Sequence, residues 1–375
     1  MAQLERIDCT VEFVTPAFLG NASQRGQWRV PPFKALLRRW WRILKAKEYE
    51  YDWRQLREAE GLLWGNAFLG ELEYADIELF RRRKNAHRKS LIALRLSHWK
   101  QGKMDIAQWR REVDLGVVRT VKSAPRPVPV ALYTGYGPVD QRSRLLSRER
   151  EPAIGVGETQ QLTCILRSTT DFPSAQLHDD LRRTLELVSF FGALGSRSSN
   201  GWGSLQCDGV GLPEELPLRN WQECLMDDFG GMQGWPHAVG CDNKGALIWQ
   251  TKSVGKWQDA LRQLGLALAQ IRQTAKNHAK GPGMTAVFLL GYPVQRPHAV
   301  RGLPNTARWA SQMRMKVQRL ADGRYRGLVY HLPHMPPRPL WQRLDASQRA
   351  WVQRHQRDIW QEIHDWLDGN LQRLS

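Results

Sequence analysis

The chain has 375 residues, with 55 Lys and Arg against 37 Asp and Glu and a formal net charge of +18. This length predicts two domains, and the excess of positive charge predicts an acidic polymer such as nucleic acid as the partner. No apolar run approaches the ~20 residues needed to span a bilayer, and the acidic, alternating N-terminus does not resemble a signal peptide. We therefore expect no membrane partner and a cytoplasmic location.

The first predicted element is a strand over residues 7–13, where apolar and polar side chains alternate. Pro31 and Pro32 then begin a helix that is expected to end near Lys47. At helical periodicity this helix has one apolar face and one basic face. The apolar face carries Phe33, Leu36, Leu37, Trp40, Ile43 and Leu44, and the basic face carries Lys34, Arg38, Arg42 and Lys45.

Strands and a second helix follow in the same half of the chain. Strands are predicted over residues 75–80, 128–133 and 161–166, and a helix over residues 177–188. A glycine-rich loop from Gly192 to Leu205 leads into a short strand through Cys207. The order strand, helix, strands, helix, strand is that of a ferredoxin-like fold, which RNA-recognition domains share.

The stretch 209–236 is punctuated by proline and glycine, so we place a domain boundary within it, between residues 1–215 and 216–375. After it the pattern restarts. The second half has predicted strands over 246–251 and 285–290, helices over 257–271 and after Pro339, and a hairpin from 313–317 to 325–330. We therefore predict an α+β protein with two tandem ferredoxin-like domains, in which antiparallel sheets carry helices on one face.

The loop from Gly192 to Leu205 contains four glycines around Arg197. Glycines let backbone N–H groups approach an anion closely, and Arg197 and the neighbouring serines add further donors. The lysine and hydroxyl residue that complete a P-loop are missing, so the loop does not predict nucleotide hydrolysis. It is either a phosphate-binding loop or a flexible connection that binds nothing.

The ferredoxin-like order places the first helix and the glycine-rich loop beside the same sheet, and we expect them to frame one groove for RNA phosphates. For the helix alone, a solvated basic face is the alternative.

Trp28 and Trp202 lie in glycine-containing loops beside arginines and are expected to stack on bases. The predicted RNA-binding residues are Arg25, Trp28, Arg29, Lys34, Arg38, Arg39, Arg42, Gly195, Ser196, Arg197, Ser198, Ser199, Asn200 and Trp202. The other prominent tryptophans, Trp40, Trp351 and Trp366, follow apolar helical stripes and are expected in the core.

The sequence predicts no catalytic residue, metal or cofactor. His331 and His334 have a metal-like spacing, but no paired cysteines accompany them. Nuclease chemistry needs metal-binding carboxylates or a positioned base. The acidic pair Asp227 and Asp228 lies in the presumed linker, and no partner can be named for His87.

Several segments resemble the RAMP superfamily of CRISPR proteins, and in particular the first-numbered, capping subunit of the type III-B, or Cmr, effector complex. The opening strand, polar loop and first helix carry the most specific similarity. The glycine-rich loop by itself is typical only of the superfamily. The similar segments are VEFVTPAFLGNAS, WRVPPFKALLRRWWR, GLLWGN, GALGSRSSNGWGSL and RWASQMRMKVQRLADGRYRGLVYHLP.

The resemblance implies a non-catalytic subunit that lies toward the 3′ region of the guide RNA, helps to capture target RNA and binds neighbouring subunits. The superfamily motif usually carries more basic residues than this chain, which has Ser199 and Asn200 at the later positions. Arg197 is therefore expected to carry more of the phosphate contact. Two alternatives remain open: a guide-RNA-processing endoribonuclease of the same superfamily, and a free-standing double RNA-binding protein.

Overall fold

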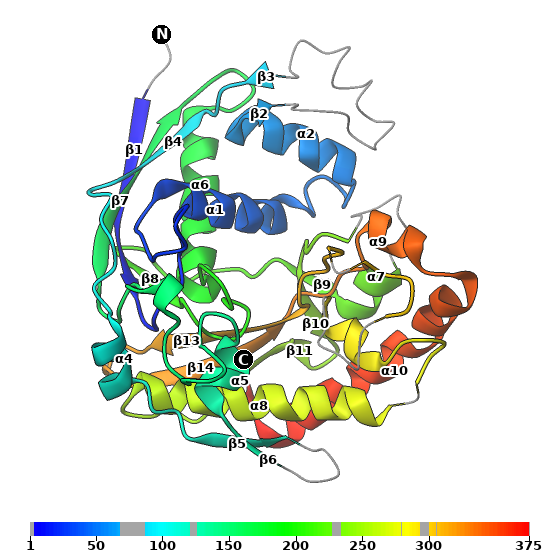
Figure 1. Cartoon of the computed structure of the whole chain (residues 1–375). Helices are drawn as coiled ribbons and strands as arrows, with labels where there is room; N and C mark the ends of the chain where they lie inside the picture. The colour runs from blue at the N-terminus through cyan, green and yellow to red at the C-terminus, as the bar shows by residue number, and fades with distance from the viewer. Residues whose placement is uncertain are drawn as a thin grey trace.

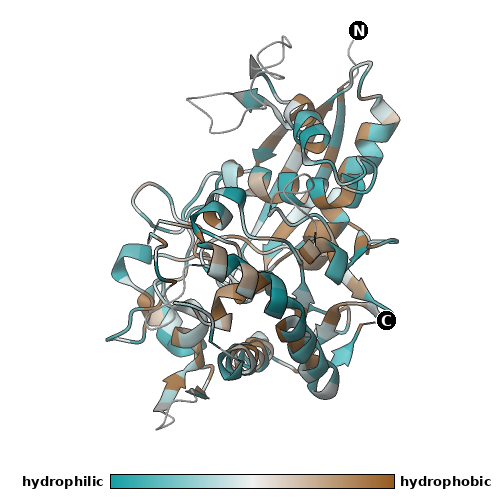
Figure 2. Ribbon diagram, turned by 90° about the vertical axis from the view of Figure 1, so that its right-hand side faces the viewer, coloured by the Kyte–Doolittle hydropathy of each residue, from teal (hydrophilic) through white to brown (hydrophobic). Residues whose placement is uncertain are grey.

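The computed structural model describes residues 4–67, 87–120, 126–226, 234–278, 280–292, 300–304 and 306–374. Two four-stranded antiparallel sheets with flanking helices dominate it (Figure 1). The helices carry apolar and polar residues side by side, as expected when one side packs on a sheet and the other meets solvent (Figure 2). The protein is thus of the α+β class, as the sequence predicts.

The first sheet has the strand order β4-β7-β1-β8, and every neighbouring pair is antiparallel. Helices α1 and α6 cover one of its faces (Figure 1). The elements are β1 (Leu4–Phe13), α1 (Val30–Lys45), β4 (Ile92–Leu96), β7 (Thr159–Arg167), α6 (Ser174–Phe191) and β8 (Leu205–Asp208). In chain order these are strand, helix, two strands, helix and strand, which is the ferredoxin-like arrangement.

The second sheet repeats this topology with the order β13-β14-β12-β15, again antiparallel throughout. Its helices α8 and α10 are longer than those of the first sheet. The elements are β12 (Ile248–Gln250), α8 (Trp257–Asn277), β13 (Met313–Arg319), β14 (Tyr325–His331), α10 (Ala346–Asn370) and β15 (Gln372–Arg373). The prediction of two ferredoxin-like units is confirmed by strand order. The division at residues 215 and 216 stays a proposal.

Smaller elements connect and extend these two units. They are α2 (Trp53–Trp64), β2 (Asn66–Ala67), β3 (His87–Arg88), α4 (Ile106–Glu112), β5 (Val117–Thr120), β6 (Arg126–Pro129), α5 (Val130–Gly135), η1 (Arg148–Arg150), β9 (Leu218–Asn220), α7 (Trp221–Met226), β10 (Val239–Asp242), β11 (Gly245–Ala246), η2 (Ala286–Leu290) and α9 (Arg338–Arg343).

Two predicted strands are wrong in part or entirely. In place of the strand predicted over 285–290, residues Ala286–Leu290 form the 3-10 helix η2. The strand predicted over 128–133 ends at Pro129, and α5 begins at Val130. Both are short apolar runs, whose periodicity does not distinguish a strand from a buried helical turn. The strand predicted over 75–80 lies outside the described residues.

The end of α6 joins the two units. Like any helix, α6 leaves its last carbonyl groups without partners inside the helix, and three of them accept hydrogen bonds from the second sheet. Gln318 Nε2 lies 2.8 Å from the carbonyl oxygen of Phe190, and the Tyr330 hydroxyl lies 2.9 Å from that of Phe191. Lys316 Nζ donates to the carbonyl oxygen of Ser189, and its burial lowers its pKa to about 7.

Four buried histidines lie in the second unit. They are His237, His331, His334 and His364, and His364 Nε2 lies 3.0 Å from His331 Nδ1. Desolvation lowers the pKa of His237 to about 4 and those of His334 and His364 to about 3, and it also lowers the pKa of His331. The native fold therefore requires all four imidazoles to be neutral.

Acid should destabilise the protein well above the range in which carboxylates titrate. Because the folded pKa values lie below the unfolded value, the unfolded chain binds more protons, and stability that is complete above about pH 6.5 is lost as the pH falls. Each fully shifted histidine contributes a slope of up to about 1.4 kcal/mol per pH unit. Denaturant unfolding between pH 7 and pH 5 measures this slope.

The substitution His364→Gln should flatten this dependence, because a glutamine has no proton to gain. The control His178→Gln changes an exposed histidine of α6 and should leave the slope as it is. Equal slopes for His364→Gln and the wild type would contradict the assignment.

Candidate nucleic-acid interface

Helix α1 packs as its periodicity predicts, but its basic face is not a simple solvated stripe. Phe33, Leu36 and Trp40 are buried on the apolar side. Lys45 was expected on the basic face. It is instead 3% exposed, with its Nζ 3.0 Å from Asp180 Oδ1 of α6. Lys45 therefore joins two helices of the first unit.

Arg38 and Arg42 converge on one carboxylate. Arg38 Nε lies 2.8 Å and Arg42 Nη1 lies 3.3 Å from Glu60 Oε1, which α2 supplies. Arg57 Nη1 approaches the other oxygen of Glu60 at 3.5 Å. Glu60 is only 1% exposed, so a single buried carboxylate balances three guanidinium groups. The basic face holds α2 in place and still carries excess positive charge.

Glu60→Gln should destabilise the protein by about 3 kcal/mol, because it leaves three adjacent guanidinium groups without their carboxylate. Chemical denaturation measures the change. Asp179→Asn is the control, since Asp179 pairs with Arg182 at 3.0 Å on an exposed part of α6 and such pairs contribute at most about 1 kcal/mol. A loss for Glu60→Gln no larger than the control's would show that this cluster does not stabilise the fold.

The loop before α1 does not present Trp28 to a ligand. Trp28 is fully buried, with its ring 4.9 Å from that of Phe13 and its indole N–H 3.3 Å from a Glu158 oxygen. Base stacking by Trp28 is therefore a wrong prediction. Arg29 donates to the carbonyl oxygen of Gly20 at 2.7 Å and closes the loop, whereas Arg25 is exposed.

Trp202 in the glycine-rich loop is also fully buried, so the second stacking prediction is wrong. Its indole N–H donates to the Thr134 hydroxyl at 3.0 Å. The Asn200 amide donates to the Thr134 carbonyl at 2.8 Å, and the Ser199 carbonyl accepts from Met315 N of β13 at 3.0 Å. These bonds fasten the loop to both units of the protein.

Backbone N–H groups of the same loop are also used internally. The N–H of Ser196 donates to the carbonyl of Phe18, that of Ser198 to Gly195 and that of Asn200 to Arg197. Glycine is required at 203, where φ is +64° and an added Cβ would lie 1.9 Å from the Leu194 oxygen. The close approach of the Leu194 oxygen therefore gives Gly203 a packing role.

Gly203→Ala should unfold or severely destabilise the protein, by more than about 4 kcal/mol, since no flexible side chain can give way. Gly209→Ala is the matched control. Its φ is +83°, but nothing lies within 4 Å of an added Cβ, so it should lose only the ~1–2 kcal/mol of a left-handed backbone. Equal losses in thermal or chemical unfolding would contradict the close-packing argument.

Arg197 differs from its neighbours, because it is exposed. Its Nε donates to the Tyr136 carbonyl at 2.6 Å, and desolvation and the nearby Arg272 charge lower its pKa. The Arg272 guanidinium lies 4.9 Å from the centre of the Tyr133 ring. Arg197 of the glycine-rich loop thus lies near Arg272 of α8, which contacts Tyr133 of α5. No contact joins Arg197 to Arg38 or Arg42, so one groove shared by α1 and the loop remains a prediction.

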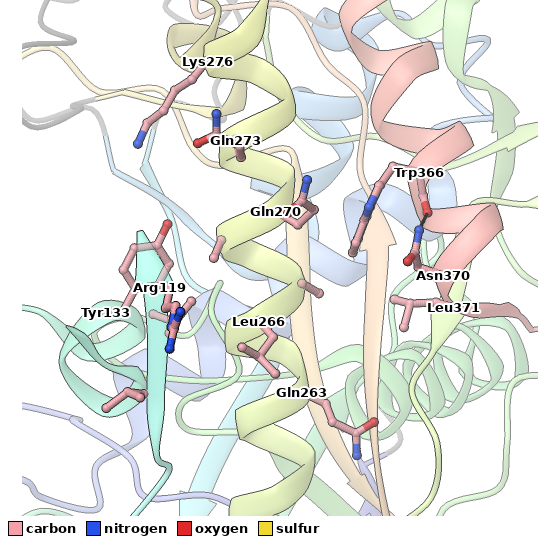
Figure 3. Close-up of a pocket in the computed structure, with 14 residues that line it drawn as sticks. Arg119, Tyr133, Gln263, Leu266, Gln270, Gln273, Lys276, Trp366, Asn370 and Leu371 are labelled. Carbon is pink, nitrogen blue, oxygen red and sulfur yellow. Dashed lines mark hydrogen bonds between the residues drawn. The ribbon is translucent and has the colours of Figure 1, made fainter. Parts of the chain in front are cut away.

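Tyr133 also lines a cavity of about 550 Å³ along the outer side of α8. In Figure 3, Arg119 and Tyr133 lie on one side of α8, and Trp366, Asn370 and Leu371 lie on the other. Gln263, Gln270, Gln273 and Lys276 of α8 also line the cavity, and no Asp or Glu is among the described residues that line it. Trp366 was expected in the core but is only half-buried here.

Sequence reasoning did not find this α8 groove, which β5, α5, α8 and α10 form together. In the sequence, the residues that line this groove are only scattered amides and aromatic residues far apart in the chain.

Among the described residues no group of three or more His, Cys, Asp or Glu could hold a metal ion. No helix in the described part of the chain is long and apolar enough to cross a membrane.

The fold and these surfaces define a protein of two tandem ferredoxin-like domains, with one groove along α8 that contains basic and aromatic residues. In structure the chain is similar to apo Cmr1 from Pyrococcus furiosus, with a TM-score of 0.47 and 14% identity over 88% of this chain and 89% of that one.

Two cryo-electron microscopy structures of the type III-B Cmr-beta complex also contain similar chains. One complex is bound to cognate target RNA, with a TM-score of 0.42 and 11% identity over 97% and 100% of the two chains. The other is bound to cognate target RNA and AMPPnP in the presence of single-stranded DNA, with a TM-score of 0.40 and 10% identity over 98% and 100%. No protein-family model matches the chain, and no curated protein is similar to it in sequence.

Proposed function

We propose that this chain is a non-catalytic, RNA-binding subunit of a type III-B CRISPR effector complex in the cytoplasm. It lies toward the 3′ region of the guide RNA, helps to capture target RNA and contacts other subunits of the complex. The sequence segments that resemble the capping subunit, the two ferredoxin-like units and the net charge of +18 support this function.

The observation that carries RNA binding is the α8 groove together with Arg197 and Arg272. Cations attract the phosphate backbone, half-exposed aromatic rings stack on unpaired bases, and amides form hydrogen bonds with base edges. The groove supplies all three through Lys276, Tyr133 and Gln270, without an acidic lining residue to repel RNA. We place single-stranded RNA there, with α1 as a second basic surface.

The sheet surfaces themselves are poor alternatives. RNA-recognition domains stack bases on aromatic residues of the open sheet face. The exposed positions of β1 and β7 carry no aromatic residue. The second sheet contacts α6 through Lys316, Gln318 and Tyr330. RNA is therefore expected on helices and loops.

Arg272→Gln combined with Tyr133→Ala should weaken binding of single-stranded RNA at least about tenfold, because a phosphate contact and a stacking ring are both removed. The dependence of affinity on salt should also become shallower by about one counterion. Fluorescence anisotropy at several salt concentrations measures both quantities. Arg182→Gln on α6 is the control and should change neither. Unchanged affinity in the double variant would remove the groove from the RNA site.

Copurification tests the complex itself. The tagged chain should recover guide RNA and a fixed set of neighbouring subunits, and incubation with labelled repeat RNA should leave that RNA intact. Metal-independent cleavage would favour the endoribonuclease instead. Tight RNA binding without any fixed partner would favour a free-standing RNA-binding protein.

A further inference from the structure

A second group of cations lies where α1 meets the second sheet, apart from the α8 groove. Arg39 follows Arg38 on α1, and Arg314 is on β13 directly opposite Tyr330 of β14. The ring of Tyr330 lies 6.4 Å from that of Trp40, the next residue of α1. Arg39 and Arg314 therefore come from different domains and lie on either side of the Trp40–Tyr330 contact between them.

The two guanidinium groups have no counter-ion within the described part of the chain. Neither makes a hydrogen bond or an ion pair there, and the Nε of Arg314 is buried without a partner. Desolvation and the charges of Arg314 and Arg42 lower the pKa of Arg39 to about 10, and desolvation lowers that of Arg314. Two like charges at a domain contact repel each other and lose hydration, which is unfavourable unless an anion lies between them.

The groups around the pair do not supply a negative charge. Burial raises the pKa of the neighbouring Tyr330 phenol to about 12, and the α2 carboxylate of Glu60 is shared among Arg38, Arg42 and Arg57. His334 is 1% exposed, with its Nδ1 2.8 Å from the Leu332 carbonyl oxygen and its Nε2 without a partner. Arg39 and Arg314 are themselves only partly buried, so part of each side chain meets solvent, although the Nε of Arg314 does not.

We propose that Arg39 and Arg314 form a phosphate-binding site at the contact between the two domains. Guanidinium groups bind phosphate oxygens through paired, charge-assisted N–H donors, and within the described residues neither Arg39 nor Arg314 uses its donors in an ion pair. A phosphate held there bridges α1 to β13 and neutralises their mutual repulsion. The phosphate is either a free anion or one group of the RNA backbone. Only the second source rests on the proposed function.

The test uses the full chain and inorganic phosphate at constant ionic strength, with chloride as the balancing anion. Phosphate should raise the melting temperature of the wild type, and Arg314→Gln and Arg39→Gln should each weaken phosphate binding at least about tenfold. In phosphate-free buffer, Arg314→Gln should be at least as stable as the wild type, since it removes an unpaired charge. If Arg314 served only to stabilise the fold, Arg314→Gln would instead be less stable than the wild type in this buffer. Arg182→Gln is the control and should respond to phosphate like the wild type.

A phosphate response that is absent from the wild type, or equal in the wild type and both variants, would overturn the site. A second binding experiment, with single-stranded RNA that lacks terminal phosphates, identifies the source of the bound phosphate. If phosphate competes with this RNA and Arg314→Gln weakens its binding, the RNA backbone occupies the site. If RNA binding is unchanged, or RNA does not bind at all, while the phosphate response persists, the occupant is a free anion. If RNA does not bind at all, the proposed RNA-binding function is contradicted, whereas the phosphate site is not.

Discussion

The contact between the end of α6 and the second sheet determines how the rest of the molecule is arranged. The four carbonyl groups at the end of the helix are all satisfied: that of Val188 by the N–H of Gly192, and the other three by side chains of β13 and β14. Beside them the Trp40 and Phe191 rings stack at 4.9 Å, and the Phe191 and Tyr330 rings lie 4.8 Å apart. Rotating one domain against the other would break these bonds and expose the rings. The domains are therefore held in one orientation.

The packing of the helices also determines which basic side chains have an acidic partner and which do not. Lys45, Arg38 and Arg42 belong to a basic helix face in the sequence, but each has an acidic partner from another helix. Positive charge without such compensation remains at Arg197 and Arg272 beside α8, and at Arg39 and Arg314 between the domains. The 55 Lys and Arg residues thus include some that stabilise the protein through carboxylates and others whose charge can attract phosphate.

The sequence predicts those parts of the fold that depend on local pattern. Alternation in β1 and β7, the apolar stripes of α1 and α6, and the hairpin from 313–317 to 325–330 give the order of elements, and that order implies the topology. The burial of Trp28 and Trp202 was not predictable, because their partners Glu158 and Thr134 are distant in the chain. The α8 groove was missed for the same reason, since it combines four separate segments.

The shared interface has a consequence for biosynthesis. The first ferredoxin-like sheet is complete once β8 has been made, whereas β14, which supplies Tyr330, follows more than a hundred residues later. During that interval Trp40 and Phe191 lack the cover that the second sheet provides, and apolar surface left open in this way favours misassociation of nascent chains. The ribosome must therefore deliver nearly the whole polypeptide before its first half reaches its final, protected state.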